Sequence, residues 1–170
     1  MPPDIETRIE IDLDRQQLTL YAGDRATARW PVSTAFNGPG EQSGSGCTPR
    51  GEHRIRIKIG EGCPVNTVFV GRRATGEVYG PQLAERFPDR DWILTRILWL
   101  CGAEPGRNRG GDCDTLRRYI YGHGCPDSEP MGVPASHGCI RMRNDDVVAL
   151  FEQVTAGTRV SISGGTRTDE

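Results

Sequence analysis

The chain has 170 residues, a length that suits one domain. Hydrophobic residues make up 35% of it, with 22 glycines and 12 prolines, which disfavours a helical bundle and favours short strands joined by many turns. The formal net charge of −2 excludes the strongly basic surface of a protein that binds nucleic acid or anionic membranes. The most apolar window, residues 92–100, is too short to span a bilayer. We therefore expect no nucleic-acid partner and no membrane insertion.

The first third of the chain predicts antiparallel strands. Apolar residues recur at every second position in residues 9–13, 18–20 and 26–32, with polar residues between them. This alternation is typical of a meander with one solvated face. A glycine-rich loop follows at residues 36–51, and we interpret its part from 37 to 51 as one wall of a site and as a lid.

The middle of the chain has a weaker pattern. Residues 55–59 alternate isoleucine with basic residues and predict another strand. We expect irregular structure over 60–91, apart from a short apolar run at 68–70. Residues 92–100 predict a mostly buried strand, with a helix as the alternative, and 102–114 predict a loop.

The clearest predicted helix begins at Asn144, a favourable N-cap residue. An apolar stripe at helical spacing runs through residues 147–154, and Gly157 follows as a stop. Residues 159–162 alternate again and predict a last strand. We expect a frayed tail over 164–170.

Six cysteines are present, and the N-terminus shows no basic start followed by an apolar run. We therefore expect reduced thiols and a cytoplasmic location, or a periplasmic one if a native signal peptide precedes this sequence. Four of the cysteines are interpreted as small hydrophobic residues: Cys47, Cys63, Cys101 and Cys113. His53, in a polar stretch, is expected at the surface.

The segment from residue 120 to 142 contains two of the three histidines, each followed by glycine and then cysteine. A nucleophilic thiol needs a nearby base, and it needs backbone N–H groups directed at the oxyanion that forms. Glycine beside the nucleophile permits a tight bend and a close approach of the backbone. A zinc site is the alternative interpretation, with the ligands His123, Cys125, His137 and Cys139.

The run Ser136-His137-Gly138-Cys139-Ile140-Arg141-Met142, preceded by His123-Gly124, resembles the L,D-transpeptidase catalytic domain (YkuD-like). Flanking similarity includes residues 48–51, and the resemblance extends over about residues 5–162. It implies a mainly β fold, a β-sandwich or curved sheet with one or two short helices. We expect a single domain over 1–170, with its core at about 5–163.

The resemblance also implies residue roles. Cys139 is the nucleophile, His123 is its base, and the carbonyl of Gly124 orients the imidazole. The backbone N–H groups of His137, Gly138 and Cys139 form the oxyanion hole. Ser136 and His137 hold this turn in place. Arg141 is either a ligand for a substrate carboxylate or a partner in a structural salt bridge.

The activity implied by the resemblance is cleavage of the bond between diaminopimelate and D-Ala in peptidoglycan stem peptides, through a thioester on Cys139. We favour an L,D-carboxypeptidase that releases terminal D-Ala during muropeptide recycling in the cytoplasm. The alternative is a periplasmic L,D-transpeptidase that forms cross-links, and an alternative of another class is a zinc-stabilised, non-catalytic binding module.

Two further expectations concern ligands and a second thiol. A carbapenem-type β-lactam is expected to acylate Cys139, and the enzyme interpretation requires no cofactor and no metal. Cys125 stands where the family usually has threonine. It is either an inert substitute or a thiol that pairs oxidatively with Cys139.

Overall fold

The computed structural model describes residues 6–165 of the chain, and it is mainly β as predicted. Its strands form one sheet in the order β3-β2-β1-β10-β4-β7-β5-β6, with β8 on β7 and β9 on β8. The strands are β1 (Thr7–Asp12), β2 (Gln17–Ala22), β3 (Arg25–Pro31), β4 (Gly51–Ile59), β5 (Thr67–Val70), β6 (Arg73–Val78), β7 (Ile93–Gly102), β8 (Tyr121–Gly124), β9 (Ile140–Met142) and β10 (Arg159–Ser163). The helices are α1 (Pro81–Arg86), α2 (Asn144–Gln153) and a 3₁₀ turn at Gly111–Cys113.

The predicted N-terminal meander is confirmed. Strand β2 pairs antiparallel with both β1 and β3, and the alternating residues Ile9 and Ile11 are almost fully buried. The last strand, β10, then joins β1 in parallel and β4 in antiparallel pairing. This crossover brings the C-terminal part of the chain into the middle of the sheet, so the N-terminal meander and the strands of the second half share one core.

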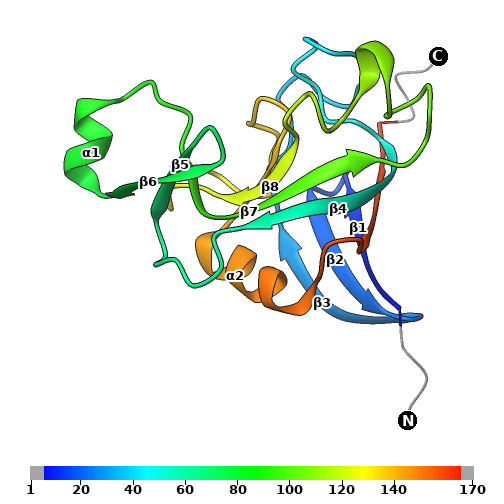
Figure 1. The fold of residues 1–170 in the computed structure, drawn as a ribbon, viewed down its shortest axis with the longest axis horizontal. Helices are drawn as coiled ribbons and strands as arrows, with labels where there is room; N and C mark the ends of the chain where they lie inside the picture. Colours follow the sequence, from blue (N-terminus) through cyan, green and yellow to red (C-terminus); the bar gives the residue numbers. More distant parts are fainter. Residues whose placement is uncertain (1–5, 166–170) are drawn as a thin grey trace.

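Helix α2 packs against β7 and β8 and covers one face of the sheet (Figure 1). Its buried residues Val147, Leu150 and Phe151 come from the predicted apolar stripe. The N-cap prediction was wrong: Arg143 is the N-cap residue, and Asn144 is the first residue of the helix. Asn144 is buried, and its side-chain amide donates to the carbonyl of Cys125 at 3.0 Å. This hydrogen bond joins the start of α2 to the segment after β8.

The prediction of irregular structure over residues 60–91 was wrong, because this stretch contains the β5–β6 hairpin and α1. Both lie together at one end of the sheet (Figure 1). Strand β6 and helix α1 contain no buried residue, so neither has the apolar periodicity by which strands and helices are recognised. The strand expected at 92–100 is confirmed as β7, and the alternative of a helix there was wrong.

Two other expectations are modified. Ile57 is 41% exposed, because a register shift between Ile55 and Ile57 turns its side chain out of the core. Of the predicted tail, residues 166–170 lie outside the described part, and the N–H of Gly165 donates to Asp14 at 3.0 Å. Within residues 6–165, neither helix has the length and apolar character needed to cross a membrane. The division into one domain over 1–170 stays a prediction.

Candidate active site

Strands β8 and β9 bring the predicted nucleophile and base to one cavity. They pair in parallel, with His123 opposite Arg141, so Cys139, which directly precedes β9, lies beside Tyr121 at the start of β8. Both His123 and Cys139 line a cavity of about 310 Å³. The other lining residues include Phe69, Arg72, Asp91, Ile97, Arg118, Tyr119, Tyr121, Ser136 and His137.

The imidazole of His123 is buried, and one hydrogen bond defines its tautomer. Nδ1 lies 2.6 Å from the carbonyl oxygen of Gly124. A carbonyl only accepts, so Nδ1 carries the proton and Nε2 of the neutral ring has a free lone pair. Burial lowers the pKa of His123 below its usual range. A side chain at position 124 would put its Cβ 2.7 Å from the carbonyl of Leu94, so only glycine fits after this histidine.

The thiol of Cys139 forms hydrogen bonds with two backbone groups. It donates to the carbonyl of Tyr119 and accepts from the N–H of Tyr121, each at 3.3 Å. Burial raises its pKa to about 12. Within residues 6–165 no hydrogen bond joins the thiol to His123, so the thiol must give up its bond to the carbonyl of Tyr119 before its proton can pass to Nε2.

The turn before the thiol is held by two buried hydroxyl groups. Ser136 donates to the carbonyl of Cys139 at 2.6 Å and accepts from the N–H of Gly138 at 3.2 Å. Thr48 donates to the carbonyl of Gly138 at 2.8 Å. Gly138 has a φ of +132°, which L side chains rarely adopt. In the part of the chain that the structure describes, the N–H groups of His137 and Cys139 bind no protein acceptor.

His137 and Arg141 converge on an acidic residue that the sequence analysis did not identify. The side chain of His137 is 77% exposed, and its Nδ1 lies 3.5 Å from Asp91. Arg141 is almost buried and forms ion pairs with Asp91 at 3.1 Å and with Glu129 at 3.4 Å. Asp91 stands in no recognisable motif, so no sequence signal pointed to it. The guanidinium of Arg141 is therefore already paired with carboxylates, and its role toward substrate stays a prediction.

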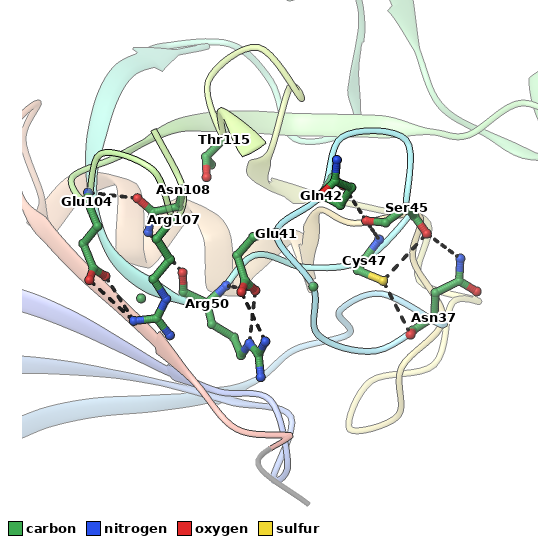
Figure 2. Close-up of polar contacts among 12 residues, drawn as sticks. Asn37, Glu41, Gln42, Ser45, Cys47, Arg50, Glu104, Arg107, Asn108 and Thr115 are labelled. Atoms are coloured by element: carbon green, nitrogen blue, oxygen red, sulfur yellow. Dashed lines mark hydrogen bonds and ion pairs between the residues drawn. The ribbon is translucent and has the colours of Figure 1, made fainter. Parts of the chain in front are cut away.

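The glycine-rich loop contacts the turn that carries the candidate nucleophile, through the hydrogen bond from Thr48 to Gly138. None of residues 37–51 lines the cavity, so the expectation that this loop forms a wall was wrong. Figure 2 shows how the loop is anchored: Glu41 receives a two-pronged hydrogen bond from Arg50, and Asn108 donates to the carbonyl of Arg50 at 3.0 Å. Arg118 donates to the carbonyl of Cys47 at 2.6 Å. These contacts favour a fixed support for the turn at Gly138 over a lid.

The other histidine was wrongly expected at the surface. His53 is 1% exposed, and its ring nitrogens lie 3.0 Å from the carbonyl of Gly51 and 3.0 Å from the hydroxyl of Thr115. Burial lowers its pKa to about 4. His53 is thus a structural residue that joins β4 to the segment before β8, and it does not line the cavity.

The six cysteines are free thiols. Cys125 is buried, its thiol donates to the carbonyl of Met142 at 3.5 Å, and burial raises its pKa to about 12. Among residues 6–165 no three His, Cys, Asp or Glu side chains are arranged to hold a metal ion. The ligand set of the zinc alternative is therefore not assembled in the described chain.

Comparisons with known proteins identify the family of this chain. The family model "YkuD: L,D-transpeptidase catalytic domain" matches residues 6–162. The "Probable L,D-transpeptidase YbiS" of Escherichia coli (strain K12) is 50% identical over 119 residues, which cover 66% of this chain and 39% of that protein.

Among solved structures, the L,D-transpeptidase from Mycobacterium smegmatis superposes with a TM-score of 0.56 at 17% identity, over 94% of this chain and 59% of that one. LdtMt1 in complex with imipenem gives 0.57 at 17% identity, over the same shares. These likenesses confirm the fold, and the chain spans less than two thirds of the proteins that it matches. On the match to residues 6–162, the chain belongs to the YkuD family of L,D-transpeptidase catalytic domains.

Proposed function

We propose that this chain is a cysteine acyltransferase that cleaves the diaminopimelate–D-Ala bond of a tetrapeptide stem and passes the acyl group to water. The Cys139 sulfur attacks the scissile carbonyl carbon while Nε2 of His123 takes the thiol proton. His123 then gives this proton to the leaving nitrogen, so D-Ala departs and a thioester remains. Water attacks the thioester with His123 as base, which releases the tripeptide and restores the thiol.

The observation that carries this proposal is that the Cys139 thiol and the buried imidazole of His123, whose tautomer is set by Gly124, line one cavity. Because burial raises the pKa of Cys139 to about 12, little thiolate exists at neutral pH and the proton must leave during attack. His123 suits this task because its Nδ1 proton is held by Gly124, so Nε2 is the acceptor. The unbound N–H groups of His137 and Cys139 are suited to stabilise the oxyanion.

The size of the cavity supports water as the acceptor. A volume of about 310 Å³ is at the lower end for ligand sites, so it suits one peptide end rather than two stem peptides together. One observation favours an amine acceptor as the second candidate. A smaller cavity of about 170 Å³ adjoins the first, sharing Asp91, His137 and Arg141, and it is polar enough for the ammonium group of a second stem.

Mass analysis of products from a defined tetrapeptide muropeptide tests the proposal. We expect release of D-Ala and accumulation of tripeptide, with both lost in Cys139→Ala. Cys125→Ala is the matched control, since that thiol is also buried but lines the adjoining cavity. Accumulation of dimers, or exchange of D-Ala for an added D-amino acid, would replace water by an amine acceptor. No turnover of any muropeptide would contradict the enzyme proposal.

Two ligand and location proposals accompany this function. A carbapenem should add its mass to Cys139, as the imipenem complex of LdtMt1 suggests for a chain with this fold. The cytoplasmic location is a proposal that cell fractionation with an antibody would test.

The redox alternative for Cys125 is also testable. If Cys125 pairs with Cys139, oxidant should abolish activity and reductant should restore it, but Cys125→Ser should resist oxidant. An active native enzyme that is insensitive to oxidant would leave Cys125 as an inert substitute.

A further inference from the structure

Arg72 lies at the tip of the β5–β6 hairpin, at a turn position where proteins usually have glycine. Val70 pairs with Arg73, so Gly71 and Arg72 form a two-residue turn, with φ values of +56° and +66°. Turns with two positive φ values favour Asn-Gly or Gly-Gly, because side chains beyond asparagine and aspartate adopt this region reluctantly. A strained arginine beside a site suggests that its side chain is retained for a function.

Three aromatic rings hold the guanidinium of Arg72 at the cavity. It lies 4.9 Å from the ring centre of Trp99 and 4.8 Å from that of Tyr119. It also donates to the hydroxyl of Tyr121 at 3.3 Å. The indole is itself fixed, since its N–H donates to the carbonyl of Leu116 at 3.0 Å. The hairpin tip therefore presents a pre-positioned cation rather than a freely moving one.

Of the three arginines that line the cavity, Arg72 makes the fewest hydrogen bonds to the described part of the protein. Arg118 is engaged by backbone and hydroxyl oxygens of the glycine-rich loop, and Arg141 is paired with Asp91 and Glu129. Within residues 6–165, Arg72 has no carboxylate partner and makes one side-chain hydrogen bond. A guanidinium has five N–H donors. Only one of the five donors of Arg72 is bonded to the described part of the protein, so the others can bind a ligand.

The distance from the thiol is bridged by a single residue. The backbone N–H of Tyr121 donates to the Cys139 sulfur, and the hydroxyl of the same tyrosine accepts from Arg72. An anion bound by Arg72 would therefore lie one tyrosine side chain away from the reacting sulfur, within the same cavity.

We propose that Arg72, framed by Trp99, Tyr119 and Tyr121, is a carboxylate-binding subsite that selects the substrate end entering the Cys139 cavity. A guanidinium fork matches a carboxylate in a two-pronged geometry. The identity of the ligand rests on the proposed function: a stem tetrapeptide carries carboxylates on its terminal D-Ala and on the side chain of diaminopimelate. Both have the same chemistry, and the test distinguishes them.

Binding is measured by calorimetry in a Cys139→Ala background, where turnover cannot interfere. The ligands are the tetrapeptide and two monoamides, one at the D-Ala carboxyl and one at the diaminopimelate side-chain carboxyl. Arg72→Gly is the informative variant, because glycine suits the positive φ and keeps the turn. Arg73→Gln is the matched control, since Arg73 is adjacent and exposed but does not line the cavity.

We expect Arg72→Gly to raise the Kd of the tetrapeptide about 10- to 150-fold, the loss of a charged hydrogen-bonded pair. Arg73→Gln should change it less than about twofold. With Arg72 intact, one of the two monoamides should bind as weakly as the tetrapeptide binds to Arg72→Gly. The Kd of that monoamide should not rise further in Arg72→Gly. Arg72→Gln serves as a second variant if the melting temperature of Arg72→Gly falls.

The inference is overturned if the Arg72 variants bind the tetrapeptide as tightly as the parent, or if both monoamides lose affinity in Arg72→Gly as the tetrapeptide does. The two proposals fail separately. Binding that depends on Arg72, in a native protein that releases no D-Ala, contradicts the proposed function alone. Release of D-Ala with binding indifferent to Arg72 contradicts this inference alone, and absence of any tetrapeptide binding contradicts both.

Discussion

Replacing Thr48 by valine tests how the turn that carries the nucleophile is held. Thr48 is fully buried, and its hydroxyl donates to the carbonyl of Gly138 at 2.8 Å while accepting from the N–H of Ala35 at 3.0 Å. Valine has nearly the same shape but binds neither group. Each buried backbone group left without a partner costs about 1–3 kcal/mol, so we expect a loss of about 2–6 kcal/mol in the free energy of unfolding.

The consequence for activity follows from the position of Gly138. Its turn carries the N–H groups assigned to the oxyanion, so a loosened turn should lower kcat about 10- to 100-fold, with less effect on KM. Urea unfolding followed by tryptophan fluorescence gives the stability, and D-Ala release gives kcat. Thr48→Ser is the control, because it keeps the hydroxyl and loses one methyl group, about 1 kcal/mol.

The reasoning is refuted if Thr48→Val unfolds within about 0.5 kcal/mol of the native protein. It is also refuted if Thr48→Ser and Thr48→Val lose equal stability and equal kcat, because the effect would then come from packing of the methyl group and not from the hydroxyl.

The remaining predictions concern pH. The alkylation rate of Cys139, followed by peptide mass analysis, should rise about tenfold per pH unit up to pH 10 without a plateau, because burial raises the thiol pKa to about 12. For His53, burial lowers the folded pKa to about 4 from 6.5. The unfolded chain therefore binds more protons between these values, so the contribution of His53 to stability is present above pH 6.5 and is lost as the pH falls to 4. Its size is about 3 kcal/mol, and His53→Gln should lack this part of the pH dependence in urea unfolding.

Two outcomes would contradict these predictions. A plateau in the alkylation of Cys139 near neutral pH would indicate a preformed thiolate–imidazolium pair. An equal loss of stability between pH 6.5 and 4 in native protein and His53→Gln would show that His53 does not titrate in this way.

The strands with one buried face could be predicted because alternation reports burial directly, as with Ile9 and Ile11 in β1. The hairpin of β5 and β6 could not, because β6 is an exposed edge strand with no apolar face and its turn has arginine where glycine is usual. The burial of His53 was missed, although a signal was available. His53 lies two residues before the buried Ile55 in β4, and alternate residues of a strand face the same side of the sheet.

The candidate nucleophile Cys139 and base His123 were identified from the motif, because a thiol and an imidazole are recognisable as a nucleophile and a base from the sequence alone. The supports within the motif, Gly124 and Ser136, were identified with them. The more distant supports were not, because these are contacts between separate segments of the chain. Asp91, Thr48 and Arg72 reach the site from separate parts of the chain, and no local pattern announces a hydrogen bond such as that of Thr48 to Gly138, 90 positions away.

The most direct test of the account is detection of the acyl-enzyme. The protein is mixed with tetrapeptide, quenched in acid within the first turnovers, and analysed by intact mass and peptide mapping. The account predicts a mass increase equal to the tetrapeptide less D-Ala, located on Cys139 and greatly slowed in His123→Gln. Release of D-Ala by Cys139→Ala at the native rate, or an acyl group located on another residue, would contradict it.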